Sequence, residues 1–338
     1  MKTYRFDRLT GIDDLTLHDE AEPAPQRGEV VVRIHAVSLN YRDLSVVLGN
    51  YVHAVKAGLV PCSDAAGEVV AVGEGVTAWK PGDRVMSTFH PRWFGGRPHR
   101  TMGSEVYGSH QDGWLAEYKL CSQEALVAVP PGMSFEDAST LPCAGLTAWT
   151  SLSGNPPIRA GQTVLTLGTG GVPVFTVQLA KLLGATVIST TSSARKGEVL
   201  RALGADHVVN YAEIADWGAH VKKQVTGGLG VDCVVEVGGA GTINQSLTAV
   251  RWGGEVVLVG FLSTDNPGMD YFQLKGSGAT VRAIGVGDRA GLEDLARVVA
   301  GGRLKPVIDK VFPFGEARAA FEHLKAARHI GKIVISVR

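Results

Sequence analysis

A glycine-rich segment is the first place in this sequence where residue types and spacing point to chemistry. The tetrad Gly168-Thr169-Gly170-Gly171 follows an apolar, β-branched run at 163–167 and precedes apolar residues at helical spacing. In such a strand, glycine turn and helix, backbone N–H groups and the helix dipole bind a pyrophosphate. Gly168 permits the tight turn, and Gly170 lets the backbone approach the phosphates. The predicted dinucleotide-binding residues of this turn are Gly168, Gly170, Gly171 and Val172.

The match to the usual GxGxxG pattern is incomplete because Pro173 stands in place of the third glycine. Proline is well tolerated in the first turn of a helix, so the departure weakens the pattern without removing it. A glycine cluster alone is often an ordinary turn. Five further short apolar strands follow at suitable spacing, and this context favours the dinucleotide-binding interpretation.

The residues about twenty positions beyond the glycine turn indicate which nicotinamide dinucleotide binds. NAD-specific proteins place an acid there to accept hydrogen bonds from the adenosine ribose, whereas this sequence has Thr191. Ser192, Arg195 and Lys196 follow, and they offer a hydroxyl and two cations to a 2′-phosphate. The alternative is that Ser192 and Ser193 only cap the next helix while both cations are solvated. We expect NADP(H), bound on its adenosine side by Thr191, Ser192, Arg195 and Lys196.

Composition argues against several classes of function. The chain of 338 residues has a formal net charge of zero and a pI of about 7.2, so nothing marks a nucleic-acid or anionic-membrane surface. The N-terminal residues are too polar for a signal peptide, and no apolar run is long enough to span a bilayer. The four cysteines lie far apart without a CxxC pair, which argues against a disulfide framework and a structural zinc knuckle. We expect a soluble cytoplasmic protein.

The elements that must position these residues fall into two patterns. Short β-type runs up to residue 129 predict a small barrel, and a helical stretch at 135–152, bent or divided by Pro142, follows them. Beyond residue 161, strand and helix alternate six times, which predicts a parallel, doubly wound sheet. A last strand at 332–337 is expected to rejoin the barrel. The expected barrel strands are 30–37, 66–72, 83–87, 115–120 and 126–129, and the expected parallel strands are 163–167, 186–189, 207–210, 231–237, 255–259 and 280–284.

Six segments, in one order along nearly the whole chain, resemble those of a known family. They are residues 40–43 (NYRD), 64–73 (DAAGEVVAVG), 80–85 (KPGDRV), 141–149 (LPCAGLTAW), 168–172 (GTGGV) and 203–206 (LGAD). With them the chain resembles the zinc-independent branch of the medium-chain dehydrogenase/reductase superfamily and is similar to quinone oxidoreductases and alcohol-dehydrogenase-like proteins. The resemblance implies an α/β fold in which a Rossmann domain, 145–287, is inserted into a GroES-like β-barrel domain, 1–144 and 288–338. It also implies an active site in the cleft between these domains.

The resemblance further implies that no zinc binds. Zinc-dependent relatives hold the catalytic metal with a Cys, a His and a second Cys, and the matching positions here are Asn40, Ser63 and Cys143. An amide and an alcohol cannot supply the imidazole and thiolate donors of a tetrahedral zinc site. The four-cysteine lobe of those relatives should fall within residues 89–113, which contain no cysteine. We therefore expect neither a catalytic nor a structural zinc ion.

Without a metal, the negative charge that hydride transfer places on a carbonyl oxygen must meet hydrogen-bond donors. Asn40 is the best candidate because its amide matches the former metal position, and Tyr51 and Tyr41 can donate through their phenols. Asp64 matches the glutamate behind the metal and is expected to give polar support to the site. Each assignment has an alternative, since Asn40 and Asp64 can cap turns and Tyr41 can belong to the core.

The resemblance also places residues beside the cofactor. Cys143 and Thr147 are expected among the cofactor-binding residues. Cys143 is expected to act as a small neighbour of the nicotinamide rather than as a nucleophile, because no histidine in its sequence context activates it. Tyr211 matches a position that borders the adenosine. Phe261 and Val286, near the ends of the fifth and sixth parallel strands, would lie beside the nicotinamide.

The resulting hypothesis is a zinc-independent, NADPH-dependent oxidoreductase that transfers hydride to a quinone or an α,β-unsaturated carbonyl compound. Conjugation spreads the developing charge, so such substrates need less electrostatic help than an unactivated ketone. Two alternatives stay open: a zinc-less NADP-dependent alcohol dehydrogenase, and a non-catalytic NADPH-binding protein of sensor or crystallin-like type.

We also expect a homodimer that pairs through the sixth parallel strand, residues 279–287. Val281, Ala283 and the run 284–286 make this strand apolar, and no proline blocks pairing. A two-fold axis would satisfy both sheet edges at once, and family dimers commonly join these strands. The alternative is that Arg282 shields the edge and the protein is a monomer.

Overall fold

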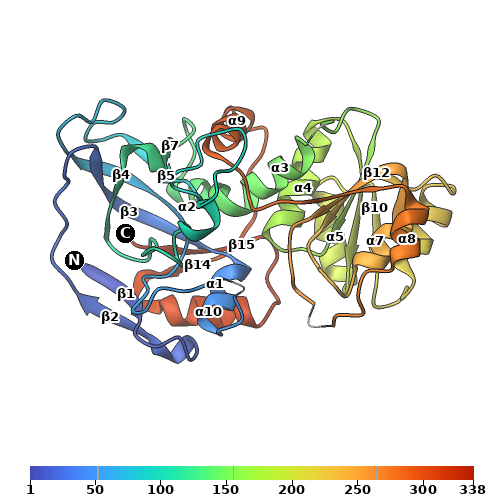
Figure 1. Ribbon diagram of the computed structural model, residues 1–338, viewed down its shortest axis with the longest axis horizontal. Helices are drawn as coiled ribbons and strands as arrows, with labels where there is room; N and C mark the ends of the chain where they lie inside the picture. Colours follow the sequence, from blue (N-terminus) through green and yellow to red (C-terminus); the bar gives the residue numbers. More distant parts are fainter. Residues whose placement is uncertain (52, 155, 264) are drawn as a thin grey trace. The chain divides into compact units, whose positions relative to one another are not determined.

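The chain forms two compact units in the computed structural model, which describes residues 1–51, 53–154, 156–263 and 265–338 (Figure 1). The first unit contains Met1–Leu146 and Gly287–Arg338, and the second contains Thr147–Val286. The first unit is therefore built from both ends of the chain, with the second unit inserted between them. No helix of the described residues is long and apolar enough to cross a lipid bilayer.

The first unit is built on a seven-stranded sheet in the order β14-β15-β3-β4-β5-β7, with β6 paired to β3. Strands β3, β4, β5 and β7 match four of the expected barrel strands, and β6 begins three residues later than expected. Strand β15 pairs antiparallel with β3, so the last strand rejoins the first unit as predicted. The strands are β3 (Glu29–Leu39), β4 (Asp64–Val72), β5 (Arg84–Ser87), β6 (Tyr118–Ser122), β7 (Leu126–Ala128), β14 (Ile308–Pro313) and β15 (Lys332–Ser336).

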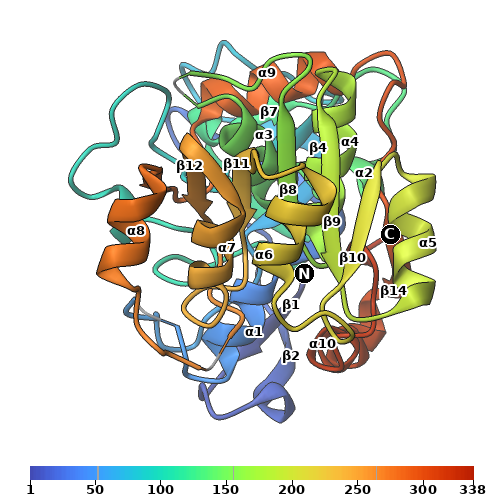
Figure 2. The same ribbon diagram turned by 90° about the vertical axis from the view of Figure 1, so that its right-hand side faces the viewer.

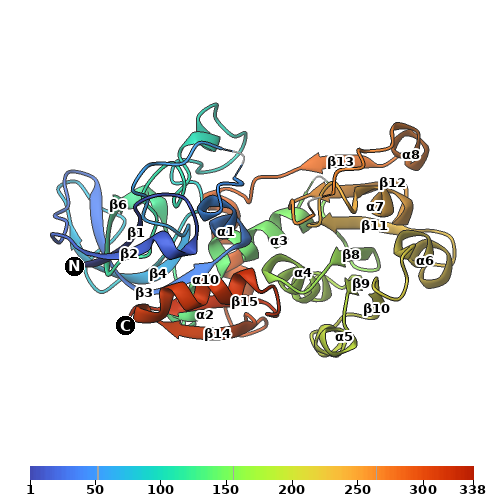
Figure 3. The same cartoon turned by 90° about the horizontal axis from the view of Figure 1, so that it is seen from below.

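Short elements that lack a clear sequence period complete this unit. A two-stranded sheet joins β1 (Lys2–Phe6) to β2 (Leu15–Asp19), and α1 (Tyr41–Val47) follows β3 directly. Figure 3 shows α1 beside α10 (Ala317–Lys325), whose buried Phe321 meets Phe6 edge-on at 5.7 Å between ring centroids. These aromatic rings, with the fully buried Trp114, belong to one hydrophobic core. The other helices are α2 (Phe135–Ser139) and α9 (Arg289–Val299).

The predicted long helix at 135–152 is divided, as Pro142 suggested. It consists of α2, a π-helical turn at Leu141–Gly145 that contains Pro142, and α3 (Leu146–Leu152). Proline lacks the backbone N–H that an α-helix would use, which explains why the regular helix is interrupted here.

The second unit is a six-stranded parallel sheet in the order β10-β9-β8-β11-β12-β13. Figure 2 shows β10 to β12 side by side, and Figure 3 labels β13. The strand order runs outward in both directions from β8 and β11, which is the topological switch point of a doubly wound sheet. Helices α4 and α5 pack against β8–β10, and α7 packs against β11 and β12. The strands are β8 (Thr163–Leu167), β9 (Thr186–Thr191), β10 (His207–Asn210), β11 (Val231–Glu236), β12 (Val250–Leu258) and β13 (Thr280–Ala283); the helices are α4 (Gly171–Leu182), α5 (Ala194–Ala202), α6 (Trp217–His220), α7 (Ile243–Ala249) and α8 (Tyr271–Ser277).

Candidate active site

The glycine turn has the geometry that a pyrophosphate requires. Gly168 follows β8 with a φ of 83°, a conformation that favours glycine, and its N–H donates to Thr190 O at 2.9 Å. Gly170 is the N-cap of α4 and makes no side-chain hydrogen bond to it. The first N–H groups of this helix therefore stay available as donors to a ligand. A Cβ built on Gly168 or Gly170 would meet no atom within 4 Å. The turn is thus open where phosphates would lie, and the residues present fit a dinucleotide.

The structure brings the expected adenosine-side residues together at the ends of β9 and β10. The Tyr211 N–H, just after β10, donates to Thr191 O at the end of β9 at 2.9 Å. Ser192 is exposed, and Ser193 holds the N-cap position of α5 without a side-chain hydrogen bond. Arg195 is exposed on the first turn of α5 and makes no ion pair within the described part of the chain.

The first turn of α5 carries two cations, Arg195 and Lys196, and no acid. This is the reverse of what the helix dipole favours, because a helix N-terminus is positive and attracts anions. Such a helix start is stabilised when an anion binds beside it.

The ends of β11 and β12 meet through a glycine loop that the sequence did not single out. The buried carboxylate of Glu236 accepts hydrogen bonds from Gly238 N at 2.7 Å, Gly239 N at 3.0 Å and Thr242 Oγ1 at 2.6 Å. A Cβ on Gly239 would lie 3.0 Å from the Cα of Phe261, so the two loops are in contact. The signal in the sequence for this loop was an acid at the end of an apolar strand, shortly before two glycines whose N–H groups it binds.

Two further cofactor candidates lie at the limits of the second unit. Thr147 is buried at the start of α3, where its carbonyl accepts a hydrogen bond from Ser151 Oγ. Val286 follows β13 with a φ of 66°, which is rare for a β-branched residue and marks backbone strain.

In the first unit, three neighbouring strands, β15, β3 and β4, bring distant polar residues together at one end of the strands. Ile333 of β15 lies opposite Leu39 of β3, so Lys332 and Asn40 are neighbours across the pair. Asp64 begins β4, where it lies opposite Ser38 of β3. Lys332, Asn40 and Asp64 are 3, 8 and 0% exposed, so this polar group is withdrawn from solvent. We call these three residues the Asn40 cluster.

Asp64 joins this cluster to Ser63 and Cys143, which match metal-ligand positions of zinc-dependent relatives. Its Oδ1 accepts from the Ser63 hydroxyl at 2.6 Å, and its Oδ2 accepts from the Cys143 N–H at 2.9 Å. Burial raises the pKa of Asp64, while the Lys332 ammonium and the Ser63 hydroxyl act in the opposite direction. Burial also raises the pKa of the Cys143 thiol. Asp64 thus joins Ser63 and the Cys143 backbone through hydrogen bonds, while its supporting role in catalysis and the place of Cys143 beside the nicotinamide stay predictions.

Asn40 has one side-chain atom engaged and one without a hydrogen bond. Its Oδ1 accepts a hydrogen bond from Lys332 Nζ, and its backbone N–H donates to Asp43 at 2.8 Å as α1 begins. Its Nδ2 is buried and has no hydrogen-bond partner among the residues that the structure describes, although it lies near enough to Asp64 to help lower the pKa of that carboxyl. A buried donor without a partner is costly, and it marks a place where a ligand acceptor would be stabilised.

The two tyrosines differ in their surroundings. The Arg42 guanidinium lies 5.0 Å from the centre of the Tyr51 ring, and Arg42 is itself held by Asp43 at 3.0 Å and by Tyr107 O at 3.1 Å. Tyr41 opens α1 and is 41% exposed, so it is not a core residue. The structure places Tyr51 beside the buried cation of Arg42.

The side chains of Asn40, Ser63 and Cys143 do not offer a donor set that fits a divalent metal. Ser63 donates its hydroxyl hydrogen to Asp64, and Asn40 Oδ1 is already bound to an ammonium group. A metal ion here would face that positive charge and would have one thiol and no imidazole as soft donors. Within the described ranges, no group of three or more His, Cys, Asp and Glu residues is placed to hold a metal.

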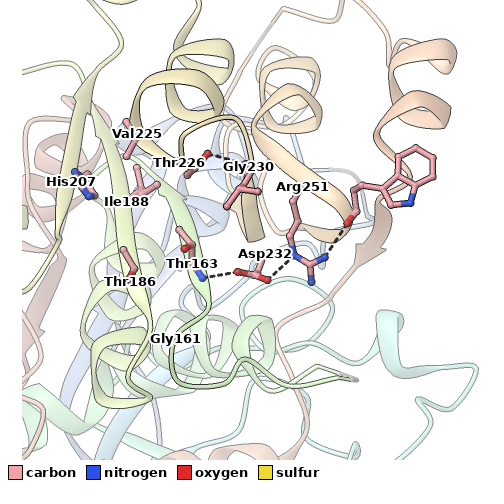
Figure 4. Close-up of a pocket in the computed structure, with 12 residues that line it drawn as sticks. Gly161, Thr163, Thr186, Ile188, His207, Val225, Thr226, Gly230, Asp232 and Arg251 are labelled. Carbon is pink, nitrogen blue, oxygen red and sulfur yellow. Dashed lines mark hydrogen bonds and ion pairs between the residues drawn. The ribbon is translucent and has the colours of Figure 1, made fainter.

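A cavity of about 540 Å³ lies elsewhere, at the amino ends of the parallel strands (Figure 4). Thr163, Thr186 and His207, the first residues of β8, β9 and β10, line it. In Figure 4 the Asp232 carboxylate lies between the Thr163 N–H and the Arg251 guanidinium, at 2.7 Å from each. Open parallel sheets bind nucleotides at the opposite, carboxyl ends of their strands, so this cavity is not the dinucleotide site.

Comparisons with known proteins match both parts of the chain. Residues 26–131 match the alcohol dehydrogenase GroES-like domain, and residues 171–301 match the zinc-binding dehydrogenase family. A zinc-type alcohol dehydrogenase-like protein of Schizosaccharomyces pombe is 36% identical over 98% of this chain and 97% of its own. An acryloyl-coenzyme A reductase of Metallosphaera sedula is 29% identical over 93% of this chain and 94% of its own.

Solved structures agree with the fold. A protein of Sinorhizobium meliloti 1021, assigned as an alcohol dehydrogenase, is 40% identical with a TM-score of 0.92 over 99% of this chain and 98% of its own. The cofactors of solved relatives differ. One is an NAD-dependent alcohol dehydrogenase, which is 32% identical with a TM-score of 0.90 over all of both chains. Another is a mycobacterial protein in complex with NADPH, which is 27% identical with a TM-score of 0.83 over 99% of this chain and 100% of its own. The GroES-like unit and the Rossmann unit predicted from the sequence are thereby confirmed.

Proposed function

Because the chain belongs to the medium-chain dehydrogenase/reductase superfamily, we propose that it transfers a hydride from NADPH to a quinone or an α,β-unsaturated carbonyl compound without a metal ion. Membership of the family makes it an oxidoreductase that uses a nicotinamide cofactor. The choice of substrate, the choice of NADPH and the absence of zinc are the parts that we add, and each rests on particular side chains.

The observation that carries the proposal is the free donor of Asn40. Hydride transfer to the substrate carbon places negative charge on the conjugated oxygen, and a donor already in position stabilises that charge more than the neutral ground state. Asn40 Nδ2 is such a donor, since it is buried and has no hydrogen-bond partner among the described residues. Tyr51, held beside Arg42, is the second candidate for a donor.

A bound nicotinamide would supply the hydride, and the second unit offers the residues to hold it. The open turn at Gly168 and Gly170 fits the pyrophosphate, and Thr191 and Tyr211 border the adenosine side. Arg195 and Lys196, with no acid in the first turn of α5, favour a 2′-phosphate and hence NADPH.

Metal independence is supported by the residues at the positions that match the zinc ligands of relatives. Asn40, Ser63 and Cys143 stand where zinc-dependent relatives have their ligands, and Lys332 already supplies a positive charge at Asn40 Oδ1. This fixed positive charge would stabilise the negative charge that develops on the substrate oxygen, as a metal ion does, but less strongly. The weaker assistance favours conjugated substrates over unactivated ketones, and the likeness to an acryloyl-coenzyme A reductase agrees with that choice.

Alcohol oxidation is the second candidate function, because two of the most similar proteins carry alcohol dehydrogenase names. A panel of quinones, enones, aldehydes and alcohols, followed through the absorbance of NADPH, separates the candidates. We expect turnover of quinones or enones that persists after chelation, and protein with no stoichiometric zinc. Faster NADP⁺ reduction with alcohols would select the second candidate, and activity that is lost on chelation would refute metal independence.

We also propose a cytoplasmic homodimer that pairs through β13. This strand is an edge of the six-stranded sheet, and Arg282 is turned inward, where it pairs with Glu255 at 2.7 Å and donates to Ser151 O at 3.1 Å. These contacts of Arg282 support pairing at this edge over the monomer alternative, in which Arg282 shields it. Nearby, α8 exposes 67% of Tyr271 and 80% of Phe272. All four cysteines are free thiols, which suits a reducing compartment.

A further inference from the structure

Lys332 is a buried cation whose partners the sequence did not suggest. Its side chain is 3% exposed, and its ammonium donates to Leu39 O at 2.5 Å and to Asn40 Oδ1. Gly331 precedes it with a φ of 77°, and a Cβ there would lie 2.2 Å from Val307 O. Only glycine fits this turn, and the turn places Lys332 at the start of β15, next to the end of β3.

The chemistry of an ammonium group determines which end of the Asn40 amide it contacts. An ammonium has three donors and no acceptor, so its partner on Asn40 must be the carbonyl oxygen. The amide nitrogen is then turned the opposite way, where it finds no hydrogen-bond partner among the described residues. This assignment of oxygen and nitrogen follows from the hydrogen-bond network and not from the shape of the side chain, which is nearly symmetric.

Without the ammonium, the Asn40 amide would have a reason to turn over. Oδ1 would then lose the donor that fixes it on the lysine side, and a rotated amide would present Oδ1 in place of Nδ2. An oxygen lone pair at that place would repel the negative charge that develops on the substrate oxygen. One rotation of a buried side chain thus separates a stabilising site from a repelling one.

We propose that Lys332 is a positioning residue that holds the Asn40 amide with its nitrogen toward the substrate oxygen. The inference rests on the proposed function, because it needs Asn40 to be the donor in hydride transfer. Lys332 acts through Asn40 and needs no contact of its own with the substrate. Leu39 O anchors the lysine independently of Asn40, so the ammonium stays in place when the amide is changed.

A double-mutant cycle tests this coupling in the full-length protein. We expect Lys332→Met to lower kcat by about 10²-fold with little change in the Kd of NADPH. In an Asn40→Ala background, the same lysine change should lower kcat by no more than about threefold, because the group that it positions is gone. Losses that multiply in the double variant would show that Lys332 acts independently of Asn40, and they would overturn the inference.

Two further variants separate positioning from a structural role. Lys119 is a control, because it is a partly buried lysine of the same unit that also donates to a backbone carbonyl, that of Asp112. Lys119→Met is expected to lower stability without a selective loss of kcat. Lys332→Gln retains an N–H that can donate to Asn40 Oδ1, so kcat within about tenfold of the unchanged protein is expected. If Lys332→Met does not fold, a folded Lys332→Gln with kcat as low as Asn40→Ala overturns the inference.

The outcomes also distinguish this inference from the proposed function. Failure to reduce any quinone or enone defeats the proposed function. Unchanged kcat in Asn40→Ala defeats the assignment of the donor. A large loss in Asn40→Ala combined with full activity in a folded Lys332→Met defeats only the positioning role of Lys332.

Discussion

Asn40 is the residue on which most of the proposed chemistry depends. We expect Asn40→Ala to lower turnover by about 10²-fold or more while the Kd of NADPH changes little, because the amide acts mainly in the transition state. Steady-state kinetics with an enone or quinone and fluorescence titration with NADPH measure the two quantities.

Asn40→Asp is the matched control for this prediction. It keeps the size of the side chain and the contact with Lys332 but replaces the donor with a carboxylate oxygen. Turnover should therefore fall at least as far as in Asn40→Ala. A variant of either kind with unchanged turnover would move the oxyanion donor to Tyr51.

His35 allows a test of pH dependence at a single residue. Its ring stacks on Phe135 at 4.2 Å between centroids, and burial, with nearby Arg33, lowers the pKa of His35 below its ordinary 6.5. The unfolded chain therefore binds a proton more readily than the folded protein, so stability is lost as the pH falls below about 6.5. Denaturant unfolding between pH 5 and 8 should show this slope, and His35→Phe should reduce it. An unchanged slope in a folded His35→Phe would contradict the prediction.

The sequence indicated residues in motifs better than residues that act across long separations. Asn40, Asp64 and Cys143 were identified from segments that resemble the family, and the structure joins them through hydrogen bonds to Asp64 or Lys332. Lys332 was missed because it lies 292 residues from Asn40, and only the pairing of β15 with β3 makes them neighbours. Glu236 was missed for a local reason, since a single acid at the end of a strand is usually solvated.

At the scale of elements, α5 carries the prediction about the cofactor. Arg195→Ala combined with Lys196→Ala should raise the Kd of NADPH by about 30-fold to 1,000-fold, because two or three charge-assisted hydrogen bonds contribute roughly 2 to 4 kcal/mol. NADH has no 2′-phosphate, so its Kd is the internal control and should change little. Equal affinities of the unchanged protein for NADPH and NADH would contradict the predicted preference for NADPH.

The glycine turn gives a prediction in which two similar substitutions differ. Gly170 has a φ of −74°, which any residue adopts, and open space beside it, so Gly170→Ala should fold normally yet bind NADPH more weakly. Gly168 has a φ of 83°, so Gly168→Ala should cost on the order of 1 to 2 kcal/mol of stability. Thermal unfolding and fluorescence titration separate these effects. A Gly170→Ala variant with unchanged NADPH affinity would contradict the proposed position of the phosphates.

Element prediction succeeded where the apolar pattern was long or regular. The expected strands at 163–167 and 207–210 coincide with β8 and β10, since an alternating α/β chain separates its strands by clear helical stretches. Strands β1 and β2 and helix α1 were not predicted. Each has only five to seven residues, which is too short for a period to show, and their stability comes from the core that they join.

At the scale of the whole molecule, the test is the number of chains in solution. Light scattering coupled to size exclusion should give the mass of two chains of 35.7 kDa. Val281→Pro should give monomers, because proline at an edge strand removes a donor needed for pairing. Phe272→Asp would add support if it also weakened the dimer. A concentration-independent mass of one chain removes the dimer, and a dimer that survives Val281→Pro removes the β13 interface.

The order in which the chain is made gives the position of β15 a consequence for biogenesis. A ribosome finishes the whole second unit, up to Val286, before it reaches Lys332. Domains commonly fold as they emerge, so the nascent chain holds a complete nucleotide-binding unit while the oxyanion site still lacks its lysine. If Asn40 and Lys332 act as proposed, competence to bind the cofactor precedes catalytic competence, and a chain released before β15 is expected to bind the cofactor without consuming it.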